Sequence, residues 1–356
     1  MTQTVRGRAL LVAGYYGCGN LGDEAIREAL RRAVAEQSDL RVRWLVAHPE
    51  REDDVARMSP FGVLSALRHS RAFALGGGGL LQNRTSTRSL LYYLALLFAA
   101  RLLRRPAFLL GQGIGPITGR FARRLTRCAL AGAAFLGCRD RGSLRALRDL
   151  GLTGTLGGDL FFLDPPEEPS SPRNETAPRI VFSLKGAPLA VGTVERFAQL
   201  LEALHTARPG ISLDLLPFFP AQDLPLASRI ATRLGSDCAI LEARTVEQAL
   251  AAIADADLVV SSRLHPLAFA LSVGTPFLAM PADPKIPGFV DEVRDLGGPA
   301  IPCELLPSVG AILRALDAPP DREALRAVCG RMHERTGAAF KAFLHALEER
   351  VGGNHG

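Results

Sequence analysis

A short polar turn, Ser261–Pro266, gathers side chains suited to acid–base chemistry and to anion binding. It contains two serine hydroxyls, the Arg263 guanidinium and the His265 imidazole. It lies between the apolar runs 256–260 and 267–271, which predicts a strand, a turn and then a helix. Open α/β sheets bind ligands at the carboxyl ends of their strands. We therefore predict a catalytic site here, in which His265 moves a proton and Arg263 holds an anion.

Two further cations follow predicted strands. Lys285 comes shortly after the run 274–279, and Arg139 comes directly after the run 134–138. Arginine holds a carboxylate or phosphate through two parallel hydrogen bonds, whereas lysine acts as a compact point charge. The alternative for Arg139 is a surface ion pair with Asp140 or Asp149, which would contribute little. We predict an anion-binding set of Arg139, Arg263, Lys285 and Ser262.

Three glycine-rich turns follow predicted strands in the first half of the chain, at 14–22, 76–79 and 111–115. Such turns can offer backbone N–H groups to a ligand. They match neither the dinucleotide-binding nor the P-loop spacing, and Asp23 adds negative charge at a helix start. This favours contact with neutral hydroxyls, or helix capping, over nucleotide binding. We predict that seven residues line the site for a ligand with hydroxyl groups, and we call them the acceptor rim. They are Gly14, Asn20, Asp23, Gly77, Gly78, Gln82 and Gln112.

Alternating strands and helices would position these turns. Strands are expected at 9–13, 42–47, 72–75, 106–110, 134–138, 179–184, 211–219, 239–241, 256–260 and 274–279. Helices are expected at 25–37, 55–68, 90–100, 120–133, 143–150, 194–207, 226–234, 245–254 and 267–271. The pattern predicts an α/β protein with two Rossmann-like, doubly wound domains, 1–164 and 179–320. A Pro-, Glu- and Ser-rich linker, 165–178, would join them, and a helical region, 321–351, would follow.

The charge of the chain is unevenly distributed. Its net charge is +6, but residues 1–164 hold 24 arginines against 13 acidic residues, and 165–356 hold 18 basic against 23 acidic residues. The halves therefore carry +11 and −5. A basic half suits a phosphorylated substrate or anionic lipid, or is a solvated helix face. We predict no nucleic-acid binding, because the arginines lack interleaved aromatic residues.

Cysteine usage and hydropathy bear on location. The six cysteines form no CxxC pair and no Cys/His metal cluster, and no secretory leader is recognisable. The most apolar stretch, 90–100, is shorter than the roughly 20 residues that cross a bilayer. We expect a cytoplasmic protein with no metal and no cofactor, in which 90–100 is a buried helix or, alternatively, a peripheral membrane contact at the inner face.

Taken in order, these motifs resemble those of polysaccharide pyruvyltransferases of the bacterial cell-surface-anchoring type. The matching segments, spread over residues 9 to 290, are 14–25, 76–82 with Ser86, 111–116, Arg139-Asp140, Gly158-Asp159, 262–265 and 283–285. The resemblance implies a fold similar to a two-domain glycosyltransferase of the B type, with the active site in the cleft. It also places Arg139, Arg263 and His265 at the family's phosphoenolpyruvate-handling positions.

The reaction that the resemblance implies is transfer of pyruvate from phosphoenolpyruvate to a sugar of a secondary cell-wall polymer. The sugar is commonly N-acetylmannosamine on a lipid-diphosphate carrier, and the product is a cyclic ketal. The basic first domain would face the diphosphate and the membrane. The alternatives are a nucleotide-sugar glycosyltransferase on the same fold and a non-catalytic module that binds phosphorylated glycans. The sequence leaves the oligomeric state open.

Overall fold

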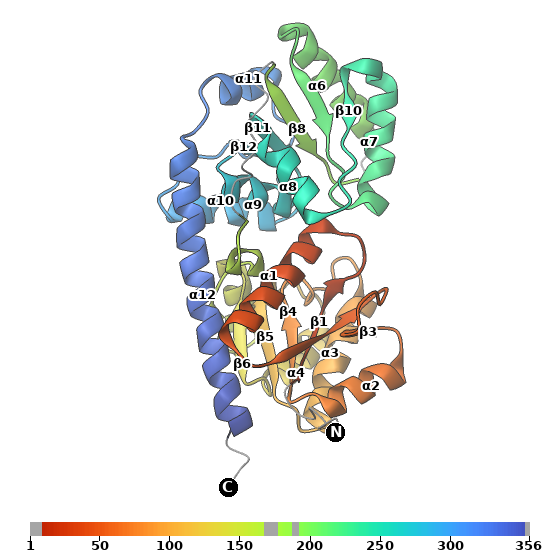
Figure 1. Ribbon diagram of the computed structural model, residues 1–356, viewed down its shortest axis with the longest axis vertical. Coiled ribbons are helices and arrows are strands. Elements are labelled where there is room, and N and C mark those ends of the chain that lie inside the picture. Colours follow the sequence, from red (N-terminus) through yellow and green to blue (C-terminus); the bar gives the residue numbers. More distant parts are fainter. Residues whose placement is uncertain (1–8, 167–176, 187–191, 353–356) are drawn as a thin grey trace, which may run out of the picture. The chain divides into compact units, whose positions relative to one another are not determined.

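The computed structural model describes residues 9–166, 177–186 and 192–352 (Figure 1). The chain forms two compact units, each with its own parallel β-sheet. Unit 1 lies within residues 1–18, 23–164 and 332–356, and unit 2 lies within residues 19–22 and 165–331. Most of the predicted linker, residues 167–176, lies outside the described part of the chain.

Unit 1 contains a seven-stranded parallel sheet in the order β3-β2-β1-β4-β5-β6-β7. The strands are β1 (Ala9–Tyr16), β2 (Arg41–Val46), β3 (Asp54–Ala56), β4 (Ala72–Gly76), β5 (Ala107–Gln112), β6 (Phe135–Cys138) and β7 (Thr155–Leu156). The chain winds outward from β1 through β2 and β3, then returns to β4 on the other side of β1 and winds the opposite way. This is the strand order of a Rossmann-like sheet.

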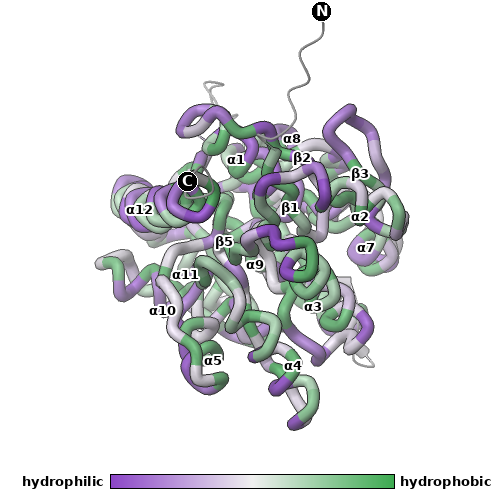
Figure 2. The backbone as a smooth tube through the Cα atoms, turned by 90° about the horizontal axis from the view of Figure 1, so that it is seen from below, coloured by the Kyte–Doolittle hydropathy of each residue, from purple (hydrophilic) through white to green (hydrophobic). Residues whose placement is uncertain are grey.

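Helices cover both faces of this sheet, which explains why its strands are continuous apolar runs. They are α1 (Leu21–Gln37), α2 (Pro60–His69), α3 (Thr87–Leu102), α4 (Arg120–Leu130), α5 (Arg141–Asp149), the short η1 (Leu160–Leu163) and part of α12 (Arg322–Gly352). On one face, Leu109 packs into a core shared with α2, α3, α4 and α5. On the other, the rings of Phe108 and Phe343 of α12 meet edge to face at 5.2 Å. Figure 2 shows α3 mainly in hydrophobic colours.

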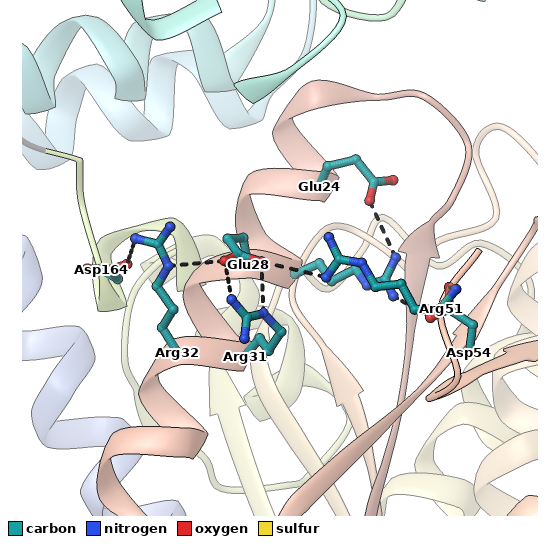
Figure 3. A network of polar contacts seen from close by, with 8 residues as sticks. Glu24, Glu28, Arg31, Arg32, Arg51, Asp54 and Asp164 are labelled. Atoms are coloured by element: carbon teal, nitrogen blue, oxygen red, sulfur yellow. Dashed lines mark hydrogen bonds and ion pairs between the residues drawn. The ribbon is translucent and has the colours of Figure 1, made fainter. Parts of the chain in front are cut away.

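Charged side chains hold the outer side of α1 in place (Figure 3). Glu28 pairs with Arg31 and Arg32, and the Arg31 hydrogen bonds lower the pKa of Glu28 to about 2 although partial burial opposes this. Arg32 also contacts Asp164 at 3.0 Å. Figure 3 also shows Asp54, whose fully buried carboxylate pairs with the nearly buried Arg27. The Arg27–Asp54 pair therefore links α1 to β3.

Unit 2 repeats the same plan with five parallel strands in the order β10-β9-β8-β11-β12. They are β8 (Arg179–Ser183), β9 (Ser212–Leu215), β10 (Ala239–Ile240), β11 (Leu258–Ser261) and β12 (Phe277–Ala279). The helices are α6 (Thr193–Ala207), α7 (Pro220–Leu234), η2 (Gly235–Asp237), α8 (Val246–Ala254), α9 (Leu264–Val273), α10 (Lys285–Asp295), α11 (Val309–Asp317) and the first part of α12. The predicted α/β class with two Rossmann-like sheets is confirmed.

Some predicted elements were wrong in type or length. The expected helix 55–68 is a strand, Asp54–Ala56, followed by α2, because Val55 pairs with Leu45 of β2 and Ser59 then caps the helix. The predicted turn after β9 is instead the first turn of α7, which begins with a proline at its first position. None of the described helices has the length and apolar character needed to cross a bilayer.

Candidate active site

The Ser261–Pro266 turn lies where the strand order of unit 2 reverses. Strands β8 and β11 are neighbours, but the chain leaves β8 toward β9 and leaves β11 toward β12. The loops therefore diverge at the carboxyl edge, which is where doubly wound sheets bind ligands. Lys185 follows β8, and its N–H donates to the Ser262 hydroxyl at 2.7 Å. This hydrogen bond spans the reversal point.

Buried hydroxyl groups fix the shape of the turn. The Ser261 hydroxyl, which has no solvent exposure, donates to the carbonyl of Ser183 at 2.9 Å and accepts from the Arg263 N–H at 3.0 Å. Helix α9 begins directly afterwards, with Arg263 at its N-cap position. His265 consequently lies in the first turn of α9, two residues beyond Arg263.

Arg263 is oriented by a buried carboxylate. Its Nη2 contacts Asp223 Oδ1 at 2.5 Å, and its guanidinium lies over the Phe219 ring, 5.7 Å from the centroid. Asp223 is 1% exposed and also accepts from the N–H groups of Gly186 and Phe219, at 3.0 and 2.8 Å. Arg263 Nε is buried and has no hydrogen-bond partner among the described residues. A guanidinium has five N–H donors, so one that is held by a carboxylate through Nη2 can still hold an anionic ligand through others.

The start of α1 lies against His265. Residues 19–22 belong to unit 2 by their contacts, and the Leu21 N–H donates to the carbonyl of Phe218 at 3.1 Å. A Cβ atom on Gly22 would lie 2.0 Å from His265 Nδ1, so only glycine fits without moving the imidazole. The Asn20 side chain accepts from the Gly22 N–H at 3.3 Å. One predicted rim residue, Asn20, is thus on the same edge as His265.

Lys285 is at the next strand end. It is the first residue of α10, which follows β12, the neighbour of β11, and its N–H donates to Asp283 at 3.1 Å. Four of the predicted residues, Ser262, Arg263, His265 and Lys285, are therefore at the carboxyl ends of adjacent strands in unit 2.

The other predicted rim residues are in unit 1, mostly where its strand order reverses between β1 and β4. Gly77 and Gly78 have φ of +73° and +72°, a conformation that favours glycine. The buried Gln112 amide donates to the carbonyl of Gly77 at 2.5 Å, and the Gly113 N–H donates to that of Gly78 at 2.7 Å. A Cβ atom on Gly78 would lie 3.3 Å from Asp23 Oδ1. The predicted residues Asp23, Gly77, Gly78 and Gln112 therefore lie close together in unit 1.

Gly14 and Gln82 have more local roles. Gly14 lies within β1, where its carbonyl accepts from the Tyr93 hydroxyl at 3.3 Å and a Cβ atom would meet the Tyr16 ring. Gln82 hydrogen-bonds Thr85 through both its amide oxygen and its amide nitrogen, in the loop before α3.

Arg139 is buried at the end of β6 and is 5% exposed. Its Nε and Nη2 donate to Asp140 at 3.1 Å, and its Nη1 is 3.9 Å from Asp159. Burial alone would raise the pKa of Asp140, but the Arg139 charge and hydrogen bonds from Ser143 lower it. The pair with Asp140 is thus present, but it is partly buried rather than on the surface, with Arg139 on its buried side. Arg139 faces two carboxylates within unit 1.

Two residues of this region were absent from the predicted set, namely Lys185 and Asp223. Lys185 ends a predicted strand and is one of only three lysines in the chain, which was a usable signal. Asp223 carried none, because it lay in a stretch that we read as a turn. Within the described residues, no group of three His, Cys, Asp or Glu side chains is placed to hold a metal ion.

Comparisons with known proteins agree with this architecture. The solved structures that match include a putative UDP-N-acetylglucosamine 2-epimerase from Listeria monocytogenes, with a TM-score of 0.62 and 11% identity over 98% of this chain and 97% of that one. UDP-GlcNAc 2-epimerase from Neisseria meningitidis, bound to UDP-GlcNAc, gives 0.60 and 13% over 96% and 99%. Anabaena Alr3699/HepE in complex with UDP and glucose gives 0.55 and 13% over 96% and 100%. At these identities the likeness concerns the fold, which is of the glycosyltransferase B type.

Sequence comparison with curated proteins gave no match. The model of one protein family, polysaccharide pyruvyl transferase, matches residues 20–284. The matched region begins at Asn20, beside His265, and includes Gly77, Gly78, Arg139 and the Ser261–Pro266 turn. The chain belongs to the polysaccharide pyruvyl transferase family.

Proposed function

We propose that this protein transfers the pyruvyl group of phosphoenolpyruvate to a sugar of a lipid-linked cell-wall polysaccharide precursor and forms a cyclic ketal. Family membership supports pyruvyl transfer to a polysaccharide. The observation that carries the choice of donor is the Arg263 guanidinium at the reversal point of unit 2, which Asp223 holds through Nη2. Phosphoenolpyruvate presents a carboxylate and a phosphate, and both require cationic donors.

Cationic and hydroxyl side chains at adjacent strand ends would bind the carboxylate and the phosphate of phosphoenolpyruvate. Arg263 would contact one anionic group through its planar fork, and Lys285 would supply a point charge at the neighbouring strand end. The Ser262 hydroxyl accepts from the Lys185 N–H and keeps its own proton for a ligand oxygen. We assign these three residues to donor binding.

His265 would act as the general acid. Histidine exchanges a proton most readily near neutral pH, and His265 lies in the first turn of α9, two residues beyond Arg263. The proton goes to C3 of phosphoenolpyruvate, and one sugar hydroxyl attacks C2. The C2–O bond to phosphate then breaks, and a second hydroxyl attacks C2 to close the ketal. One hydroxyl proton ends in the new methyl group and the other on the released phosphate, so the step balances.

The acceptor would meet mostly uncharged groups. Gly77, Gly78 and Gln112 provide a glycine-rich wall, and Asp23 and Asn20 provide oxygen atoms for hydroxyl donors. The Arg139 side chain contacts Asp140 and Asp159. Its contact with the donor stays a prediction.

The test is phosphate release from phosphoenolpyruvate in the presence of lipid-diphosphate-linked N-acetylmannosamine acceptors. We expect phosphate release that depends on the acceptor, together with a product of the mass of a pyruvyl ketal. The reaction should continue in a chelator, because phosphoenolpyruvate itself carries the activated group. Activity that is lost in a chelator and restored by a divalent ion would reject the metal-free part of the proposal.

A nucleotide-sugar glycosyltransferase is the second candidate. Its support is the fold, since the similar structures include one with UDP-GlcNAc bound and another with UDP and glucose bound. Binding titrations with phosphoenolpyruvate and with a panel of nucleotide sugars separate the two. Micromolar binding of a nucleotide sugar with no response to phosphoenolpyruvate would favour this second function.

A further inference from the structure

Large apolar side chains are exposed at the starts of three helices in unit 1. Those on and just before α2 are Met58, Phe61 and Leu64, with exposed fractions of 79%, 86% and 44%. Leu91 in the second turn of α3 is 42% exposed, and Phe121, the second residue of α4, is 76% exposed. Single exposed apolar residues are ordinary, but a group of them marks an interaction surface.

The topology places these residues along one edge of the unit. All neighbouring strands of the sheet are parallel, so each of these helices must run from the carboxyl end of one strand back to the amino end of the next. Their first turns therefore lie at the carboxyl edge. Helix α3 contacts both α2 and α4, so the three helix starts are side by side. The same edge carries Gly77, Gly78 and Gln112.

The chain segment that carries these three helix starts has charges of a single sign. Residues 55–139 contain no aspartate or glutamate, and they contain 13 arginines. Exposed arginines near the starts of α3 and α4 include Arg84, Arg88, Arg120 and Arg124. Aromatic and aliphatic side chains flanked by arginine, without acidic residues, match the interface of an anionic bilayer.

We propose that this helix-start patch, made of Met58, Phe61, Leu64, Leu91 and Phe121 with Arg84, Arg88, Arg120 and Arg124, docks unit 1 onto an anionic lipid bilayer. The inference rests on the proposed function and deepens it, because a lipid-diphosphate acceptor lies at such a surface. The apolar side chains enter the interface, and the arginines contact lipid phosphates. Docking through this edge presents the glycine-rich wall of unit 1 to the acceptor.

Leu102 supplies a matched control. It is 84% exposed and belongs to the same unit, but it is the last residue of α3 and therefore lies toward the opposite edge. Leu102 is 11 positions after Leu91, which corresponds to about 16 Å of helix. Interfacial side chains are buried by only about 5–10 Å. A bilayer that receives the helix starts therefore does not receive Leu102.

The experiment measures flotation of the full-length protein with vesicles of mixed phosphatidylglycerol and phosphatidylcholine, and with vesicles of phosphatidylcholine alone. We expect the wild-type protein to bind the anionic vesicles, and added salt to weaken binding. The F61S/F121S variant should lose about 10- to 100-fold in vesicle affinity. R120E/R124E should lose about tenfold or more on anionic vesicles only, and L102S should change by less than about twofold.

A soluble amino-sugar acceptor separates docking from catalysis. All four proteins should release phosphate from phosphoenolpyruvate at equal rates with it, which also shows that the substitutions leave the fold intact. One outcome would separate the two proposals: the wild-type protein binds vesicles and F61S/F121S does not, but none of the proteins releases phosphate. That result would support the docking surface and reject the proposed reaction. Wild-type protein that ignores anionic vesicles, F61S/F121S that binds normally, or L102S that loses as much as F61S/F121S would each overturn the docking proposal.

Discussion

The carboxyl edges of the two sheets occupy the same topological position but carry different chemistry. In unit 1, the strand order reverses between β1 and β4, and Gly77 and Gly78 follow β4 at this point. The Gln112 amide donates a hydrogen bond to the Gly77 carbonyl. In unit 2, the reversal between β8 and β11 carries Arg263 and His265. The shared strand order fixes where ligands bind, and the side chains decide which ligands.

The arginines of the two edges show the difference most clearly. Arg139 of unit 1 faces Asp140 and Asp159, so its charge is more than balanced. Arg263 of unit 2 pairs with one buried carboxylate, Asp223. This difference supports the proposal that unit 2 binds the anionic donor and unit 1 the acceptor rich in hydroxyl groups.

The largest effect should come from removing the proposed acid. We expect H265A to lower kcat by about 10²- to 10⁴-fold, which is the usual contribution of general acid catalysis. Thermal unfolding should be close to that of the wild-type protein. Steady-state phosphate release measures the first, and calorimetry the second.

His205 provides the control for that substitution. It is on α6 of the same unit, and its side chain is 37% exposed. H205A should retain wild-type turnover. If H265A also retains a near-normal rate, His265 is not the general acid, and the proposed catalytic role of this edge of unit 2 is rejected.

The next largest effect should follow from displacing the imidazole without deleting it. In G22A the new methyl group would overlap His265, so the ring must move. A shift of about 1 Å at a reacting group can cost about 100-fold in rate. We expect G22A to lower kcat by about that factor with little change in the phosphoenolpyruvate KM.

Gly337 is the matched glycine for this test. It lies inside α12, and no atom lies within 4 Å of a Cβ built on it. G337A should leave kcat unchanged and stabilise the helix by up to about 1 kcal/mol. Normal turnover in both variants would show that the contact at residue 22 does not position the imidazole.

A third test compares the two arginines. R263A should raise the phosphoenolpyruvate KM by about 10- to 100-fold, as expected for a charged hydrogen bond. It should also lower the unfolding free energy by about 3–5 kcal/mol, because the buried Asp223 carboxylate loses its cation. R139A leaves the partly exposed Asp140 and the buried Asp159 without their cation, so we expect a loss of about 1–3 kcal/mol in unfolding free energy. Urea unfolding gives the unfolding free energy of each variant, and steady-state kinetics give its KM for phosphoenolpyruvate. A rise in KM for R139A as large as that for R263A would return Arg139 to the donor site.

Much of this plan is visible in the sequence, since buried parallel strands are continuous apolar runs and the glycine-rich turns mark their ends. The strand order is not visible, because no local pattern says that β4 pairs with β1 or β11 with β8. The contact of Gly22 with His265 joins residues more than 200 positions apart, and the partnership of Asp223 with Arg263 joins a predicted turn to a strand end. Both depend on tertiary packing, which propensity and spacing do not encode.

The smallest effect concerns acid stability at the end of β6. The pKa of Asp140 is lower in the folded protein than its ordinary value, because Arg139 and Ser143 favour the carboxylate despite burial. A lowered pKa contributes stability that is present above the unfolded-state pKa of about 3.9 and is lost as pH falls through the folded-state value. D140N removes this contribution and can still cap α5. Between about pH 6 and pH 3, the wild-type protein should therefore lose more unfolding free energy than D140N, by on the order of 1 kcal/mol. Equal losses in urea titrations at the two pH values would show that the Arg139 charge is not coupled to Asp140, and the charge balance that distinguishes the two edges would need another explanation.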